Sequence, residues 1–95
     1  MRRYQFTHEA RTALDAQIDY LINQHAHSAA EALNLRVHTF VNTTLVHFPA
    51  TGRFISQRNI WETWIPHTRL IVWYVFTDET LTIVAVWHHA QDRHR

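Results

Sequence analysis

The strongest constraint on the fold is one stretch of β-branched and aromatic residues near the C-terminus, RLIVWYVF-TDET-LTIVAVWHH, from Arg69 to His89. Its first run, Arg69–Phe76, is almost unbroken, which is typical of a central strand covered on both faces. A short polar turn, Thr77–Thr80, separates it from a second β-rich run, Leu81–Trp87. The stretch therefore predicts an antiparallel hairpin made of the most hydrophobic residues in the chain.

Alternation along this hairpin predicts which side chains share a face. In the second run one face is expected to hold Leu81, Ile83, Ala85 and Trp87, and the other Thr82, Val84 and Val86. In the first run Trp73 is expected in the core, whichever face it takes.

Polar residues collect at the open end of the hairpin. The first strand begins with Arg69, and the second ends at His88, with Arg93 shortly beyond. Because the two ends of an antiparallel pair lie side by side, we expect Arg69 within a few residues of His88.

Two helices are expected before the hairpin. Apolar residues recur at three- and four-residue spacing up to about His25, and Thr7 can cap this first helix. Ser28–Glu31 matches the S-x-x-E capping box at the start of a second helix, which Pro49 and Gly52 end. The break between the two helices is so short that they must form an antiparallel hairpin.

The remaining segments complete a β-α-α-β-β-β order. Arg3–Phe6 is expected to be an edge strand, Ile60–Ile65 a third strand stopped by Pro66, and Ala50–Asn59 an irregular segment. This order predicts a single domain over residues 1–95 with an α+β fold, in which a helical hairpin packs on one face of a mainly antiparallel sheet.

Composition narrows the class of protein. The chain has no cysteine, no run near the roughly 20 apolar residues of a membrane span, and no apolar signal-peptide core in residues 1–10. We therefore expect a cytoplasmic protein with no membrane association. The formal charge of +1 is too small to indicate nucleic-acid binding by itself.

Neither a metal nor a cofactor is expected. His88 and His89 are adjacent on a strand, so they point to opposite faces and make poor partners for one ion. A single glycine cannot build a loop that cradles a nucleotide phosphate.

One constellation remains as a candidate site: Arg53, Arg58, Arg69, His88 and Arg93. If the irregular segment folds over the sheet, these residues could form a positive site with one titratable group, suited to phosphate. The alternative is a set of ordinary solvent-exposed arginines at strand ends, and the residues alone favour it. Trp61 and Trp64 point to opposite faces of their strand, so one of them is expected to be exposed.

Four segments together resemble a known family. Phe6–Ala10 (FTHEA) resembles F-T-P-E-A, Phe48–Arg53 (FPATGR) F-P-x-x-G-R, Thr68–Tyr74 (TRLIVWY) G-R-Y-x-I-x-Y, and Val86–Arg93 (VWHHAQDR) V-x-H-G-x-R-D. These are motifs of the RelE/ParE superfamily of type II toxin–antitoxin toxins, and they favour its ParE-like branch. Their order and spacing across nearly the whole chain make the resemblance specific.

The resemblance implies a toxin that poisons DNA gyrase without chemistry of its own, inhibiting growth and stabilising plasmids. It also implies an acidic cognate antitoxin whose C-terminal part wraps the toxin in a hetero-oligomer. One alternative is a RelE-like ribosome-dependent mRNA endoribonuclease, in which Arg69 and His88 would be catalytic. Glu62 cannot be assigned as its base because its facing is unknown. Another alternative is a degenerate toxin that acts only as an antitoxin-binding module.

Overall fold

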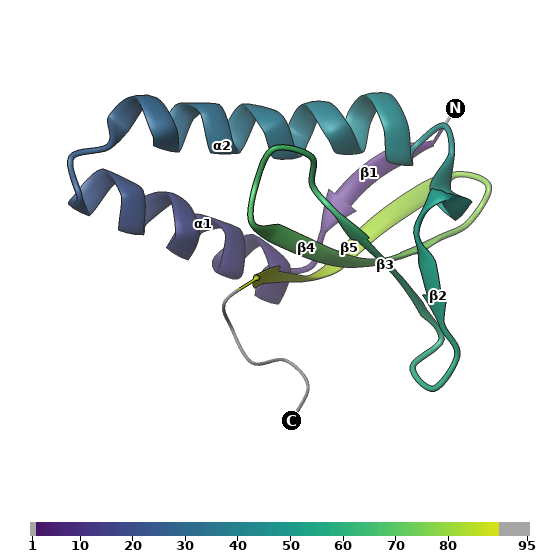
Figure 1. The fold of residues 1–95 in the computed structure, drawn as a ribbon. Helices are drawn as coiled ribbons and strands as arrows, with labels where there is room; N and C mark the ends of the chain where they lie inside the picture. Colours follow the sequence, from purple (N-terminus) through teal and green to yellow (C-terminus); the bar gives the residue numbers. More distant parts are fainter. Residues whose placement is uncertain (1, 90–95) are drawn as a thin grey trace.

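The computed structural model describes residues 2–89, in which a helical hairpin packs on one face of a mixed sheet (Figure 1). The strands are β1 (Arg3–Phe6), β2 (Arg53–Ile55), β3 (Ile60–Trp64), β4 (Leu70–Phe76) and β5 (Thr80–His88), and the helices are α1 (His8–Asn23) and α2 (His27–Phe40). The sheet order is β1-β5-β4-β3-β2, with β1 parallel to β5 and the other neighbours antiparallel. The predicted fold class is confirmed, with one strand more than expected.

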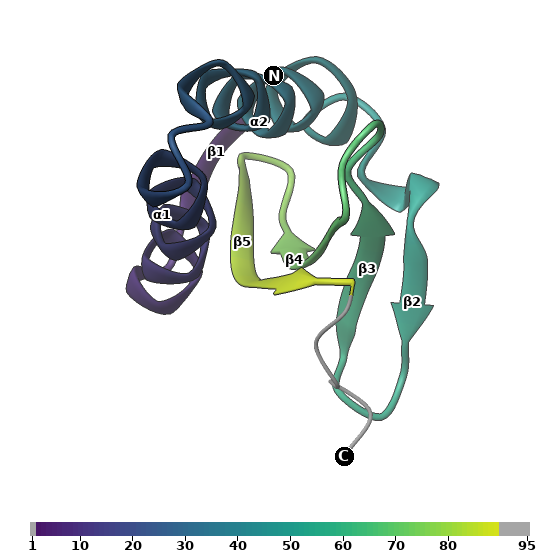
Figure 2. The ribbon, with the colours of Figure 1, turned by 60° about the vertical axis from the view of Figure 1, so that its left-hand side comes forward.

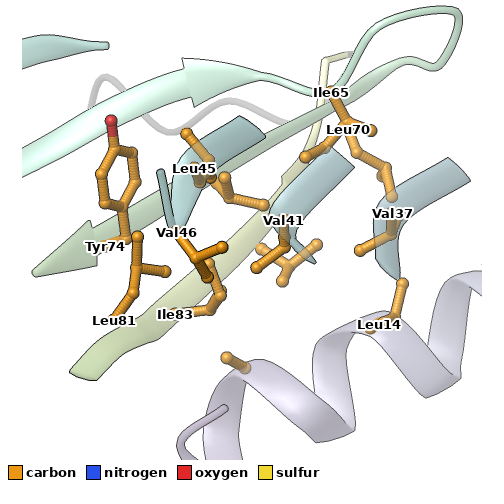
Figure 3. Packing of buried hydrophobic residues seen from close by; sticks show 13 residues of the cluster. Leu14, Val37, Val41, Leu45, Val46, Ile65, Leu70, Tyr74, Leu81 and Ile83 are labelled. Atoms are coloured by element: carbon orange, nitrogen blue, oxygen red, sulfur yellow. The ribbon is translucent and has the colours of Figure 1, made fainter. Parts of the chain in front are cut away.

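The core lies between the helical hairpin and the sheet face that it covers (Figure 3). The apolar stripes of α1, α2 and the π-helical turn that continues α2 (Val41–Leu45) meet inward-pointing residues of β4 and β5. The labelled side chains are at most 1% exposed: Leu14, Val37, Val41, Leu45, Val46, Ile65, Leu70, Tyr74, Leu81 and Ile83. Truncating one such residue to alanine typically costs about 2–5 kcal/mol, so this cluster fixes the helices on the sheet.

One predicted helix start is confirmed and the other is wrong. Thr7 caps α1, since its Oγ1 accepts a hydrogen bond from the Ala10 amide at 3.1 Å. The capping box at Ser28 does not form: α2 begins at His27, after Ala26, with no side-chain cap.

The reason lies in the way α1 ends. His25 adopts a left-handed conformation (φ 58°), and the His25 and Ala26 amides donate to the Ile22 and Leu21 carbonyls, each at 2.9 Å. This is a Schellman motif with histidine in place of the usual glycine. Because the Ala26 carbonyl already accepts from the Ala30 amide at 2.9 Å, Ser28 lies inside the first turn of α2.

A β-bulge overturns the predicted faces of the β4–β5 hairpin. Trp73 pairs with Ala85, and the next residue, Tyr74, pairs with Ile83, so Val84 is left over. Beyond this point the alternation on β5 shifts, and Val86 faces the core. Trp73 is half-buried, not in the core as predicted, because its strand neighbour Tyr74 takes the inward position.

The segment expected to be irregular contains a short strand. Within residues 50–59 the chain forms the end of a 3₁₀ turn (Pro49–Thr51) and β2, which pairs with β3. At only three residues, β2 is too short to show a periodicity in the sequence. Figures 1 and 2 show that β2 and β3 project away from the helical hairpin because the sheet is strongly twisted.

No helix in the described part of the chain is long and apolar enough to cross a membrane.

Candidate functional site

The predicted site residues do not gather in one place. Arg53 lies on β2 and Arg58 in the turn before β3, whereas Arg69 and His88 lie at the open end of the β4–β5 hairpin. Arg93 lies outside the described residues. The prediction that Arg69 lies close to His88 is confirmed, since Leu70 pairs with His88 and the Arg69 carbonyl accepts from the His89 amide at 2.6 Å.

Arg69 and His88 belong to a cleft between the helical hairpin and the end of the sheet, which we call the hairpin-end cleft. Its volume is about 190 Å³, and it is lined by Gln17, Tyr20, Leu21, Leu33, Arg69, Leu70 and His88. A guanidinium, an imidazole, a phenol and an amide thus surround an apolar floor. These donors suit an anionic group of a partner, such as a carboxylate.

Arg53 and Arg58 lie on the other face of the sheet, which points away from the helices and is called the outer face below. Arg53 pairs with Glu62 and Glu62 with Trp73 across neighbouring strands, so their side chains share a face. Because Tyr74 enters the core, the adjacent Trp73 points to the outer face.

These residues form a connected arrangement around Glu62, which is only 8% exposed. Its Oε1 accepts a hydrogen bond from Arg53 Nη2 at 2.9 Å, and its Oε2 accepts one from Trp73 Nε1 at 2.7 Å. The Arg58 guanidinium lies 5.3 Å from the centroid of the Trp73 ring, and Trp87 meets that ring edge-on at 5.3 Å. We call Arg53, Arg58, Glu62, Trp73 and Trp87 the outer cluster.

The motif Phe48–Arg53 explains how Arg53 reaches Glu62. The buried Tyr74 hydroxyl donates a 2.6 Å hydrogen bond to the Pro49 carbonyl, which ties the segment to β4. Burial raises the pKa of Tyr74 above its usual value, so the phenol stays protonated as a donor. At Gly52 a Cβ atom would lie 2.5 Å from Tyr74 Oη and 2.6 Å from the Glu62 carbonyl oxygen. Only glycine lets the chain pass this close to β3 and β4.

The positions of Glu62 and His88 decide whether the two side chains can share one acid–base site. His88 pairs with the buried Leu70 and so lies on the helix side of the sheet, whereas Glu62 lies on the outer face with both carboxylate oxygens hydrogen-bonded. The sheet therefore separates Glu62 from His88. Among residues 2–89, no group of three or more histidine, aspartate or glutamate side chains is placed to hold a metal ion.

Sequence reasoning missed a groove along α2. It has a volume of about 330 Å³ and is lined by Leu35, Arg36, Thr39, Phe40, Thr43, Thr44, Pro66 and His67. We call it the α2 groove. Leu35, 67% exposed, stands at its rim. The only sequence signal was an apolar residue outside the helix stripe, and the partner wall, the turn after β3, could not be placed from the sequence.

The predicted contrast between Trp61 and Trp64 is confirmed. Trp61 packs partly buried against the core, whereas Trp64 is 49% exposed and lies beside His89, with ring centroids 5.1 Å apart. Trp64 pairs with Ile71, two residues before Trp73, and so adds apolar surface to the outer face.

Comparison with known proteins gives a match to one family and matches among solved structures. Residues 4–93 match the family described as the ParE toxin of the type II toxin–antitoxin system parDE, a range that includes all four motifs described above. A solved structure titled "Chromosomal ParDE TA system from P. aeruginosa" is similar in fold, with a TM-score of 0.73 at 16% identity over 93% of this chain and 96% of that chain. No curated protein matches the sequence.

Proposed function

The chain belongs to the ParE toxin family of type II toxin–antitoxin systems, and from this premise we propose that it inhibits DNA gyrase and is neutralised by a cognate acidic antitoxin in the cytoplasm. The observation that carries the proposal is the family match over residues 4–93. At this level of identity the ParDE structure supports the fold alone.

The position of Glu62 favours gyrase inhibition over RNA cleavage. General acid–base catalysis needs groups within hydrogen-bond reach of the same substrate. Glu62 lies on the other face of the sheet from His88, and its two carboxylate oxygens are engaged by Arg53 and Trp73. A toxin that inhibits its target by binding needs no pair of acid–base groups at one site.

We place the contact with gyrase at the hairpin-end cleft. Arg69 and His88 stand there beside Tyr20, which is 63% exposed. The arginines of the outer cluster, Arg53 and Arg58, lie on the other face of the sheet.

The antitoxin is expected on the helical hairpin and at the sheet edges. The surface of the α2 groove is formed almost entirely by apolar atoms, although several of its residues are polar. Such a groove suits an amphipathic helix. Among the described strands, β1 and β2 are the two ends of the sheet, and each has one edge without a strand neighbour. Unpaired edges can accept an extended segment of another chain.

Two assays on the purified toxin separate the alternatives. A gyrase inhibitor blocks DNA supercoiling by purified gyrase and leaves cell-free translation intact, whereas a ribonuclease stops translation and leaves supercoiling intact. In cells, expression should induce the DNA-damage response before protein synthesis falls. Arrest of translation with unaffected supercoiling would contradict the proposal. If the toxin inhibits neither supercoiling nor translation, the chain acts only as an antitoxin-binding module.

A further inference from the structure

The outer cluster holds one arginine, Arg58, whose charge no carboxylate of residues 2–89 balances. The Arg58 guanidinium lies over the Trp73 ring at 5.3 Å from its centroid. Within residues 2–89 the one ion pair is Arg53–Glu62, so Arg58 has no acidic partner in that part of the chain. A guanidinium that lies over an aromatic ring still presents N–H donors at its rim, where a carboxylate can bind.

The second arginine, Arg53, is bonded to the buried Glu62 on one side and exposed to solvent on the other. Arg53 donates from Nη2 to Glu62 at 2.9 Å, yet its side chain is 74% exposed, while that of Glu62 is 8% exposed. Arginine has five N–H donors in a fixed fork, so one bond to Glu62 orients the group and leaves other donors toward solvent. Glu62 also fixes Trp73 through its indole N–H at 2.7 Å, and so supports the ring under Arg58.

Apolar surface lies next to the two guanidinium groups. Trp73 is half-buried, and Trp64, on the same face, is 49% exposed. A ligand that meets both arginines therefore also contacts tryptophan rings, which contribute strongly to binding in protein interfaces.

We propose that the outer cluster is a binding site for an acidic segment of a partner protein, and that Glu62 is its positioning residue. Carboxylates of the segment bind Arg53 and Arg58, and an apolar residue between them packs on Trp73 and Trp64. A nucleic acid fits less well, because two arginines around a buried carboxylate do not make a basic track and the formal charge of the chain is only +1. The site does not depend on which enzyme the toxin inhibits.

The probe is a synthetic peptide with blocked ends and the sequence Asp-Glu-Leu-Leu-Asp-Glu, added to the ¹⁵N-labelled full chain. The matched control peptide replaces each carboxylate by its amide, and an oligothymidylate tests for nucleic acid. The acidic peptide should shift the indole N–H resonances of Trp73 and Trp87. The Trp61 resonance is an internal control because its side chain packs toward the core on the other face.

Two variants and one control separate specific binding from general attraction. Arg58 is exposed and has no ion pair with a residue of the described range 2–89. Arg58→Gln should weaken peptide binding about fivefold, as expected for loss of one exposed charge pair of about 1 kcal/mol. Arg11→Gln removes the same charge at an exposed residue on α1, outside the clefts described above, and should leave the affinity within about twofold.

Glu62→Gln gives the sharpest test, because the two explanations predict opposite signs. The substitution makes the outer face more positive, so unspecific attraction would strengthen peptide binding. Loss of the positioning carboxylate should instead weaken binding, with the indole resonance of Trp73 already moved in the free protein. Thermal melts establish that each variant is folded.

The proposal is overturned by any of three results. These are equal affinity of the wild type and Arg58→Gln for the acidic peptide, shifts confined to the Trp61 resonance, or tighter binding of the oligothymidylate than of the peptide. If Glu62→Gln does not fold, Arg58→Gln against Arg11→Gln still decides the question. None of these results bears on gyrase inhibition, which the supercoiling assay measures separately.

Discussion

At the scale of single residues, His38 links the stability of the fold to pH. Its ring extends from α2 to β1, with Nδ1 2.9 Å from the Tyr4 hydroxyl and its centroid 5.6 Å from that of Phe6. Burial and, to a lesser degree, the nearby Arg11 charge lower the pKa of His38 below its usual 6.5. The native protein therefore keeps this imidazole neutral where the unfolded chain would already bind a proton.

We predict that the free energy of unfolding decreases as the pH falls below about 6.5, because there the unfolded state binds more protons at this residue. Above that pH the contribution of His38 is complete and constant. Urea unfolding between about pH 5 and pH 8 measures this, and His38→Gln should flatten the dependence in this range. An unchanged slope in His38→Gln would assign the pH dependence to other groups.

A second prediction concerns Gly52, whose role is steric, since its φ of −77° is open to any residue. Gly52→Ala should destabilise the fold by about 1–3 kcal/mol, the usual cost of overpacking. The neighbouring Thr51→Ala, at an exposed position, is the matched control and should change the thermal midpoint little.

The contact with Tyr74 can be isolated by a double-mutant cycle. Tyr74→Phe removes the hydroxyl that a Cβ at Gly52 would meet at 2.5 Å. By itself this change costs about 1 kcal/mol for the lost hydrogen bond to Pro49. Combined with Gly52→Ala it should cost less than the sum of the two single changes. Strict additivity would show that the strain at Gly52 lies elsewhere.

At the scale of elements, long periodic segments were predictable and local exceptions were not. Both helices and the β4–β5 hairpin follow from apolar periodicity, which the packing against one core imposes on many residues at once. The restart of α2 at His27 depends on the left-handed conformation of His25, which nothing in its side chain requires. The bulge opposite Trp73 likewise adds one residue to β5 without a sequence signal.

The α2 groove supplies a prediction at this scale. Leu35→Asp should weaken antitoxin binding about tenfold or more, because it places a charge in an apolar contact that we expect to be central to the interface. The fold should tolerate the change, since Leu35 is 67% exposed. Gln24→Asp, exposed after the end of α1, adds the same charge as a control. Titration calorimetry with the purified antitoxin measures both, and equal affinities would remove the groove from the interface.

At the scale of the whole molecule, the candidate site could be predicted only in part. The short turn between β4 and β5 sets their register, so the proximity of Arg69 to His88 followed from the sequence. The placement of Arg53 and Arg58 did not, because β2 was not visible and the facing of β3 was undetermined. Neighbouring residues on a strand point to opposite faces of the sheet. The facing of each strand therefore divides the predicted site into the hairpin-end cleft and the outer cluster.

Because the two arginine sites lie on opposite faces, the hairpin-end cleft can be tested by itself as the surface that contacts the target. Arg69→Ala and His88→Ala should each weaken toxicity, and the double variant should weaken it further, because a binding surface spreads its free energy over several contacts. Higher salt should also weaken gyrase inhibition, because it screens the charge of Arg69. Arg58→Ala, on the outer face, is the control for loss of one arginine, and co-purification with the antitoxin verifies folding.

A catalytic His88 would behave differently: His88→Ala alone would slow RNA cleavage by about a hundredfold or more, with no comparable effect on supercoiling. Full toxicity of the double variant, with antitoxin binding intact, would exclude the cleft from target recognition.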